Sequence, residues 1–224
     1  METSLQKLKD TASLRAGLYS LFSRIFREEA DKTLLKSMKD KLEKSDLSVI
    51  LQDTAQGPAF KSGFYNLKEF FTKKDINSVL LEELASDYAS LFLGTGKNPA
   101  HPYESVHLSE ERIIMRKPWN DVRRIYQELG LIKEKTFTQP EDHIAVELDF
   151  MAHLCLEMQS AIDKGETESV DRLIKTQQDF LKNHLALWVP EFCDDILKGS
   201  SENGFYGAVA QILREFILLE QKLY

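Results

Sequence analysis

The chain has 224 residues, of which 42% are hydrophobic and 29% are charged, and its formal net charge is -7. This length fits one domain, or one domain with a loosely attached helical element, and the composition is typical of a globular protein. The acidic balance argues against nonspecific binding to nucleic acid, which needs clustered Lys and Arg, and it suits a basic partner.

Apolar residues recur at three- and four-residue steps almost throughout the chain, a spacing that predicts helices. The first two predicted helices cover residues 5–26 and 34–42. Gly57-Pro58 and Gly63 indicate a break before a third helical segment over 64–71. Since no strand, repeat or low-complexity tract is evident, we expect an all-α fold, a single globular bundle of roughly eight to ten helices over residues 1–224.

A further helix is predicted over 76–92, with Asp75 as its N-cap, and it ends at Gly94-Thr95-Gly96. The next dozen residues contain Pro99 and Pro102 and have no periodicity, so they are predicted to form an irregular loop. A long irregular loop in a chain whose other connections are short is a candidate functional segment.

The third quarter of the chain contains the sharpest apolar pattern. Pro118 is expected to begin a helix that Gly130 ends. From residue 144 to residue 158, apolar side chains recur at alternating four- and three-residue steps, which predicts a narrow packing seam along a helix that ends at Gly165.

The last quarter is predicted to be helical as well. Thr167 is the expected cap of one helix, Pro190 is expected to interrupt it, and a final helix begins near Ser201. Cys155 and Cys193 lie within apolar helical patterns and lack metal-ligand spacing, which favours buried thiols in a reducing compartment. The N-terminal segment lacks the apolar core of a signal peptide, and no apolar run reaches the ~20 residues that span a bilayer. We therefore expect a cytoplasmic protein without stable membrane insertion.

A polar segment precedes the apolar seam. Residues 138–141, Thr-Gln-Pro-Glu, fit a capping box, and Asp142 follows where the helix dipole favours a negative charge. His143 and Glu147 are four residues apart and therefore neighbours on one flank of the seam. An imidazole beside a carboxylate could titrate near neutrality or bind a polar group. Spacing alone favours the alternative, a surface ion pair that contributes little to stability.

Motifs for metal, nucleotide or covalent chemistry are weak or missing in the sequence. A metal site built from His143 and Glu147 would need more ligands, because His153 lies on a different side of the predicted helix. Residues 94–98 resemble a phosphate loop only superficially, since Leu91 stands where the pattern requires glycine. We therefore expect neither an enzyme nor a resident cofactor.

Two segments of this sequence carry a resemblance to a known family. Residues 88–106 contain Tyr-Ala-Ser-Leu-Phe-Leu-Gly-Thr-Gly and then Pro-Tyr-Glu-Ser-Val, and residues 140–151 read Pro-Glu-Asp-His-Ile-Ala-Val-Glu-Leu-Asp-Phe-Met. Both are similar to the most characteristic segments of the TorD/DmsD family of cytoplasmic chaperones. Helix order and length match as well, so the resemblance spans nearly the whole chain. Asp149 and Gln139 depart from it, since the family commonly has glutamate at both positions.

The resemblance implies a peptide-binding site. Asp142 and His143 match the Asp-His pair that is implicated in leader recognition, and apolar residues of the earlier segment match the hydrophobic side of that site. Periodicity alone favours a core role for Tyr88, Leu91 and Phe92, with groove lining as the alternative. A leader that is basic at one end and apolar behind needs acidic residues beside an apolar groove. The residues expected at the site are Tyr88, Leu91, Phe92, Pro102, Tyr103, Glu104, Asp142, His143 and Glu147.

The implied function is that of a chaperone, monomeric or homodimeric. It would hold a molybdopterin-dependent oxidoreductase and its twin-arginine leader until the cofactor is inserted, and so prevent premature export. Weak guanine-nucleotide binding, known in parts of the family, is an open alternative to a protein without any cofactor. Two other functions also stay open: a nitrate-reductase-assembly-type chaperone for a leaderless catalytic subunit, and an enzyme that uses His143 and nearby carboxylates.

Overall fold

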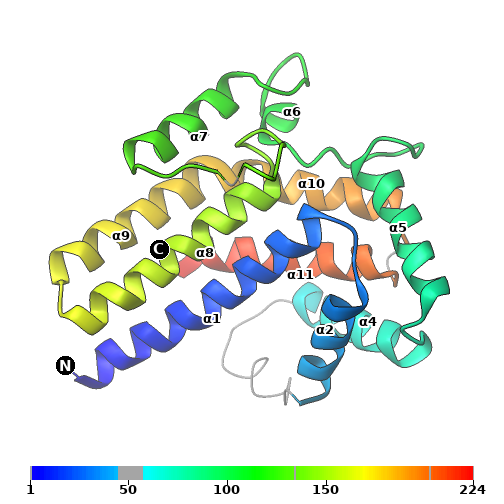
Figure 1. Cartoon of the computed structure of the whole chain (residues 1–224), viewed down its shortest axis with the longest axis horizontal. Coiled ribbons are helices and arrows are strands. Elements are labelled where there is room, and N and C mark those ends of the chain that lie inside the picture. The colour runs from blue at the N-terminus through cyan, green and yellow to red at the C-terminus, as the bar shows by residue number, and fades with distance from the viewer. Residues whose placement is uncertain (1, 45–57, 134, 202, 224) are drawn as a thin grey trace. The chain divides into compact units, whose positions relative to one another are not determined.

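The computed structural model describes residues 2–44, 58–133, 135–201 and 203–223 (Figure 1). Within these residues the fold is all-α, as predicted, and the extended backbone forms an isolated antiparallel bridge between Tyr103 and His143. The contacts divide the chain into two compact units. Unit 1 contains the described residues of 1–27 and 102–188, and unit 2 contains those of 28–101 and 189–223.

Unit 1 is built from helices of very different lengths. They are α1 (Glu2–Arg27), α6 (Glu104–Leu108), α7 (Lys117–Glu128), α8 (Ile144–Lys164), α9 (Thr167–Phe180), the π-helical turn η1 (Leu181–Leu185) and the first residues of α10 (Ala186–Gly199). The long helices α1 and α8 lie side by side, and α9 packs against α8 (Figure 1). This packing makes α8 the central element of unit 1.

The predicted seam of α8 is confirmed as core. Each of its apolar side chains is no more than 1% exposed, which is the burial that a narrow stripe between two packed helices requires: Ile144, Leu148, Met151, Cys155 and Met158. The Oγ of Ser23 on α1 donates a hydrogen bond of 2.7 Å to the carbonyl of Ala145 and so fixes the first turn of α8. The helix ends, as predicted, at Gly165, whose φ of 72° is readily adopted by glycine.

Unit 2 contains α2 (Lys32–Lys44), α4 (Pro58–Lys73), α5 (Ser78–Phe92), most of α10 and α11 (Phe205–Leu223). The prediction of a break at Gly63 is wrong, because Gly63 lies within α4. A β-carbon at this residue would lie 2.8 Å from Cγ1 of Ile212, so the glycine allows α4 and α11 to pack closely. Gly57, the other predicted break, lies outside the described residues.

Several predicted helix boundaries are corrected. Asn77 rather than Asp75 caps α5, since its side chain accepts the amide hydrogen of Leu80 at 3.0 Å. The cap of α9 is Glu166, and Thr167 is the first helical residue. The final helix, α11, starts at Phe205, four residues after Ser201.

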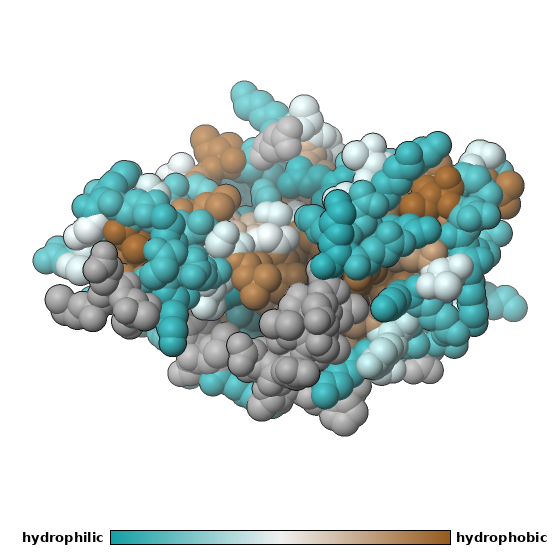
Figure 2. Space-filling view, turned by 90° about the horizontal axis from the view of Figure 1, so that it is seen from below, coloured by the Kyte–Doolittle hydropathy of each residue, from teal (hydrophilic) through white to brown (hydrophobic). Residues whose placement is uncertain are grey.

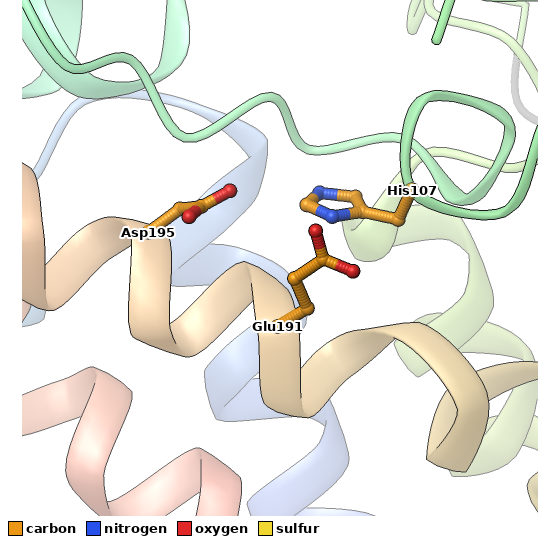
Figure 3. Close-up of side chains that lie close together, drawn as sticks. All are labelled: His107, Glu191 and Asp195. Carbon is orange, nitrogen blue, oxygen red and sulfur yellow. The ribbon is translucent and has the colours of Figure 1, made fainter. Parts of the chain in front are cut away.

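The prediction that Pro190 interrupts a helix is wrong, because Pro190 lies inside α10. Proline has no N–H, so the carbonyl of Ala186, four residues earlier, lacks its usual helical donor. Ala186 is the first residue of α10 and follows the π-helical turn, so the missing bond falls at the end of the helix. Glu191 and Asp195 follow it on one side of α10, one turn apart (Figure 3).

Both cysteines are free and buried, as expected. Hydrophilic residues cover much of the face seen in Figure 2, with apolar side chains between them, in keeping with the high charged fraction of the sequence. Among the described helices, none is both long enough and apolar enough to cross a membrane.

Candidate functional site

The two segments that the sequence singled out meet inside unit 1. The amide of Ile144 donates to the carbonyl of Pro102 at 2.9 Å, and the amide of Glu104 donates to the carbonyl of Asp142 at 3.0 Å. Between these two bonds lies the antiparallel bridge of Tyr103 with His143. Tyr103 and His143, both expected at the site, therefore lie side by side. Backbone hydrogen bonds join the loop before α6 to the loop before α8.

Asp142 joins the loop before α8 to the first turn of α6. Its Oδ2 accepts hydrogen bonds from the amide of Ser105, at 2.9 Å, and from the Ser105 hydroxyl, at 2.5 Å. The carboxyl group thus satisfies a free amide of α6, in place of a capping side chain from α6 itself. The residue is fully buried, and this burial raises the pKa of the Asp142 carboxyl, although the bonds from Ser105 lower it.

His143 is the N-cap of α8. Its Nδ1 accepts the amide hydrogen of Ala145 at 3.1 Å, and its ring lies edge-on to those of Tyr103 and Phe137, with both centroids 5.2 Å away. Burial, and then the positive charges of Arg27 and Lys133, lower the pKa of the imidazole to about 3. The imidazole is therefore neutral near neutral pH, with its proton on Nε2.

The predicted capping box at residues 138–141 is wrong. The helix starts later than the capping box requires, since His143 supplies the capping acceptor and α8 begins at Ile144. Glu141 instead accepts a hydrogen bond of 2.6 Å from the indole of Trp119 on α7. The acidic residue therefore connects the loop to α7.

Glu147 belongs to a buried polar network and not to the surface ion pair that spacing favoured. Its Oε2 accepts a hydrogen bond of 3.1 Å from the indole of Trp188, and its carboxyl group is fully buried next to that of Glu104. Burial, and then the negative charge of Glu104, raise the pKa of Glu147 well above its ordinary value. A protonated Glu147 can donate to Glu104, which accounts for the contact between the two acids.

Glu104 is shared between this network and His184. Both of its carboxylate oxygens lie 3.0 Å from Nδ1 of His184, and the two residues are 1% and 7% exposed. His184, Trp188 and Ser105 also belong to the site, although they were not predicted from the sequence. The available signal was weak: His184 and Trp188 are four residues apart in an apolar pattern and so lie on one side of the chain.

Most of the residues that were predicted to contact a peptide are buried. Asp142 and His143 are at most 3% exposed, so the surface position that spacing favoured for His143 is wrong. Glu104 and Pro102 are buried too. Tyr103 is half-buried, and its hydroxyl donates to Oε1 of Gln139 at 2.8 Å. Most of the predicted polar residues therefore hold the loops together.

The remaining predicted residues, Tyr88, Leu91 and Phe92, belong to unit 2. All are buried, and the ring of Phe92 packs against Phe192 and Tyr206, with centroids 6.1 and 5.4 Å away. These contacts account for the core role that periodicity favoured, and contact with a peptide stays a prediction.

The irregular loop after α5 is confirmed, since the described residues 93–103 contain no helix. Gly94 has a φ of 75°, and the amide of Ala100 donates to the carbonyl of Leu91 at 2.8 Å, which folds the loop back on α5. A β-carbon on Gly96 would lie 2.2 Å from the hydroxyl of Ser90. The glycines therefore allow the chain to turn tightly at the end of the helix.

Comparison with known proteins identifies the family. The chain matches the family described as nitrate reductase delta subunit over residues 56–194. The chaperone protein TorD of Photobacterium profundum is 35% identical over 162 residues, covering 72% of this chain and 70% of that protein. The chaperone protein TorD of Vibrio parahaemolyticus is 30% identical over 216 residues, covering 96% and 97%. The chain belongs to the TorD family of chaperones. The family resemblance stated from the sequence is thereby confirmed.

A solved structure shares the fold of this TorD family member. The redox enzyme maturation protein from Archaeoglobus fulgidus superposes with a TM-score of 0.50 at 22% identity, covering 92% of this chain and 94% of that chain. As a TorD family member, the protein is a chaperone of molybdoenzyme maturation and not an enzyme. The alternative of an enzyme that uses His143 is therefore wrong. Nδ1 of His143 instead caps α8 by accepting the amide hydrogen of Ala145.

Proposed function

We propose that this chaperone acts in the cytoplasm, binds the twin-arginine leader of a molybdoenzyme precursor directly, and retains the precursor until its cofactor is inserted. The observation that carries the proposal is the junction of segments 102–105 and 142–147, each of which runs from a loop into the first turn of a helix. The two segments share backbone hydrogen bonds and a buried carboxyl network. Such a junction gives a loop surface one fixed conformation. A rigid surface lowers the entropic cost of ordering a flexible peptide.

The buried residues Asp142 and His143 do not touch the leader, and they affect its binding by fixing the conformation of the surface above them. Asp142 fixes the start of α6, and His143 fixes the start of α8. Half-buried Tyr103 lies between them and offers an aromatic face beside this junction. Changes at Asp142 or His143 would then lower leader affinity together with stability, whereas a change at Tyr103 would act mainly on affinity.

The proposed interaction requires neither a metal ion nor a nucleotide. Apolar contacts and a few charged contacts are sufficient for a peptide of this kind. Leader binding should therefore have the same affinity with a chelator or with added guanine nucleotide. A change in affinity with GTP would support the alternative of nucleotide binding.

Titration calorimetry of the full chain with synthetic leaders tests the proposal. A dissociation constant near micromolar, about -8 kcal/mol, is expected for the leader of the client enzyme. A scrambled leader of the same composition serves as the control. Failure to bind any leader, together with binding to a leaderless catalytic subunit, would assign the protein to nitrate-reductase-type assembly instead.

A further inference from the structure

Unit 1 has a pocket of about 590 Å³ beside α6 and α7. Its walls come from α6, the loop that follows it, the start of α7, the π-helical turn and the start of α10. Glu104 and His184 line it, so the buried carboxyl network described above forms part of its wall. The pocket therefore adjoins the junction of the two loops that characterise the family.

Exposed apolar side chains line this pocket or lie in the loop that forms one of its walls. Leu108 and Leu187, which line it, are 39% and 56% exposed. Three consecutive apolar residues, Ile113, Ile114 and Met115, are 45%, 45% and 49% exposed in the loop that connects lining residues of α6 and α7. Single exposed apolar residues are common, whereas a run of three beside a pocket is typical of an interaction site.

The same loop has an unusual backbone. Arg112 and Met115 have φ values of 51° and 59°, in the left-handed region that non-glycine residues seldom adopt. Such residues cluster at binding sites, where the surrounding structure maintains a strained conformation. Here the conformation presents the apolar residues of the loop to solvent instead of burying them.

The charges of the pocket favour a basic occupant. Four carboxyl side chains line the pocket, compared with two cationic side chains, those of Arg116 and Lys117. Both cations have acidic partners nearby: Lys117 pairs with Asp121, and Nε of Arg116 lies 3.9 Å from Glu111. Glu110 forms no ion pair with the residues that the structure describes. A carboxylate without a partner beside apolar residues is complementary to a peptide that is basic and then apolar.

We propose that this pocket is where the leader docks, with an arginine of the leader near Glu110 and the apolar segment of the leader over Leu108, Leu187 and the 113–115 loop. The inference rests on the proposed function and goes beyond it by extending the contact surface from Tyr103 to this pocket. The leader touches the outer wall of the carboxyl network, and Asp142, His143 and Glu147 remain buried behind it.

Matched pairs of surface variants test this inference by calorimetry with a synthetic leader. Leu187→Asn removes an apolar contact of the pocket, and Leu156→Asn removes an equally exposed leucine, 53%, from α8. Glu110→Gln removes the unpaired charge, and Glu157→Gln removes another exposed carboxylate of α8. All four positions are on the surface, so unchanged melting temperatures would show that the variants are folded.

We expect Leu187→Asn to weaken leader binding about fivefold to tenfold, since part of a leucine is no longer buried on binding. Glu110→Gln should weaken it about threefold at low salt and less at high salt, because salt screens exposed charges. Both controls should stay within about twofold of wild type. A photoreactive benzoylphenylalanine in place of Ile114 should crosslink to the apolar part of the leader, and one in place of Leu156 should not.

The outcomes separate this inference from the function on which it rests. If the wild-type protein binds no leader, the proposed function fails and the docking surface fails with it. If it binds a leader but Leu187→Asn behaves like Leu156→Asn, and Ile114 gives no crosslink, the docking surface is wrong and leader binding stands.

Discussion

The low pKa of His143 makes a quantitative prediction about acid stability. In the folded protein, burial lowers this pKa from its ordinary value of 6.5 to about 3. A difference of this size corresponds to on the order of 5 kcal/mol between the two protonation states. Because the unfolded chain binds the proton more tightly, this stability is fully present above about pH 6.5 and is lost as the pH falls towards about 3.

The loss should already be measurable in mild acid. Between about pH 7 and about pH 5, an imidazole with these pKa values lowers the free energy of unfolding by about 2 kcal/mol. His143→Asn removes the titrating ring and keeps a side chain that can cap a helix. At neutral pH the variant should be less stable by roughly 2 kcal/mol, because it loses the ring contacts with Tyr103 and Phe137.

Urea unfolding followed by the helical circular dichroism signal measures both quantities. The free-energy difference between wild type and His143→Asn should shrink by about 2 kcal/mol from pH 7 to pH 5, since the other groups titrate equally in both proteins. His153→Asn, at a half-buried position of the same helix, is the control for a histidine-to-asparagine change on α8. A constant difference between wild type and His143→Asn would refute a buried, neutral imidazole at this position.

Other consequences of the site can be measured in the same way. Asp142→Ala leaves the amide and the hydroxyl of Ser105 without their acceptor, so we expect a loss of about 2–3 kcal/mol in the free energy of unfolding. A loss below about 1 kcal/mol would contradict the capping of α6 by Asp142. Burial raises the pKa of Glu147, so its contribution to stability is full below the ordinary value of 4.5 and is lost as the pH rises above it. Glu147→Gln does not titrate, so it should gain stability relative to wild type as the pH is raised from about 4.5. A pH-independent difference would mean that Glu147 is ionised when folded. In the leader, a leucine-to-polar change should weaken binding more than loss of one arginine, and calorimetry showing the reverse order would make charge the main source of affinity.

The helical periodicity of the sequence determined the fold class and the core of the long helices. The seam of α8 was predicted residue by residue, because a stripe at alternating three- and four-residue steps can be buried only on a helix. Glycines with positive φ, such as Gly130 and Gly165, ended helices where expected. Gly63 was misinterpreted because its role is tertiary: it allows α11 to approach α4.

The local resemblance determined the family and the two loops that meet at the site, whereas the roles of individual residues depended on tertiary contacts. Spacing placed His143 and Glu147 on one flank of α8 but could not show which element covers that flank. The indole of Trp188 and the carboxyl of Glu104 cover Glu147, and aromatic rings cover His143. Burial is a property of the surrounding elements and not of the helix itself, so only the tertiary structure decided that these polar residues form the interior of the site.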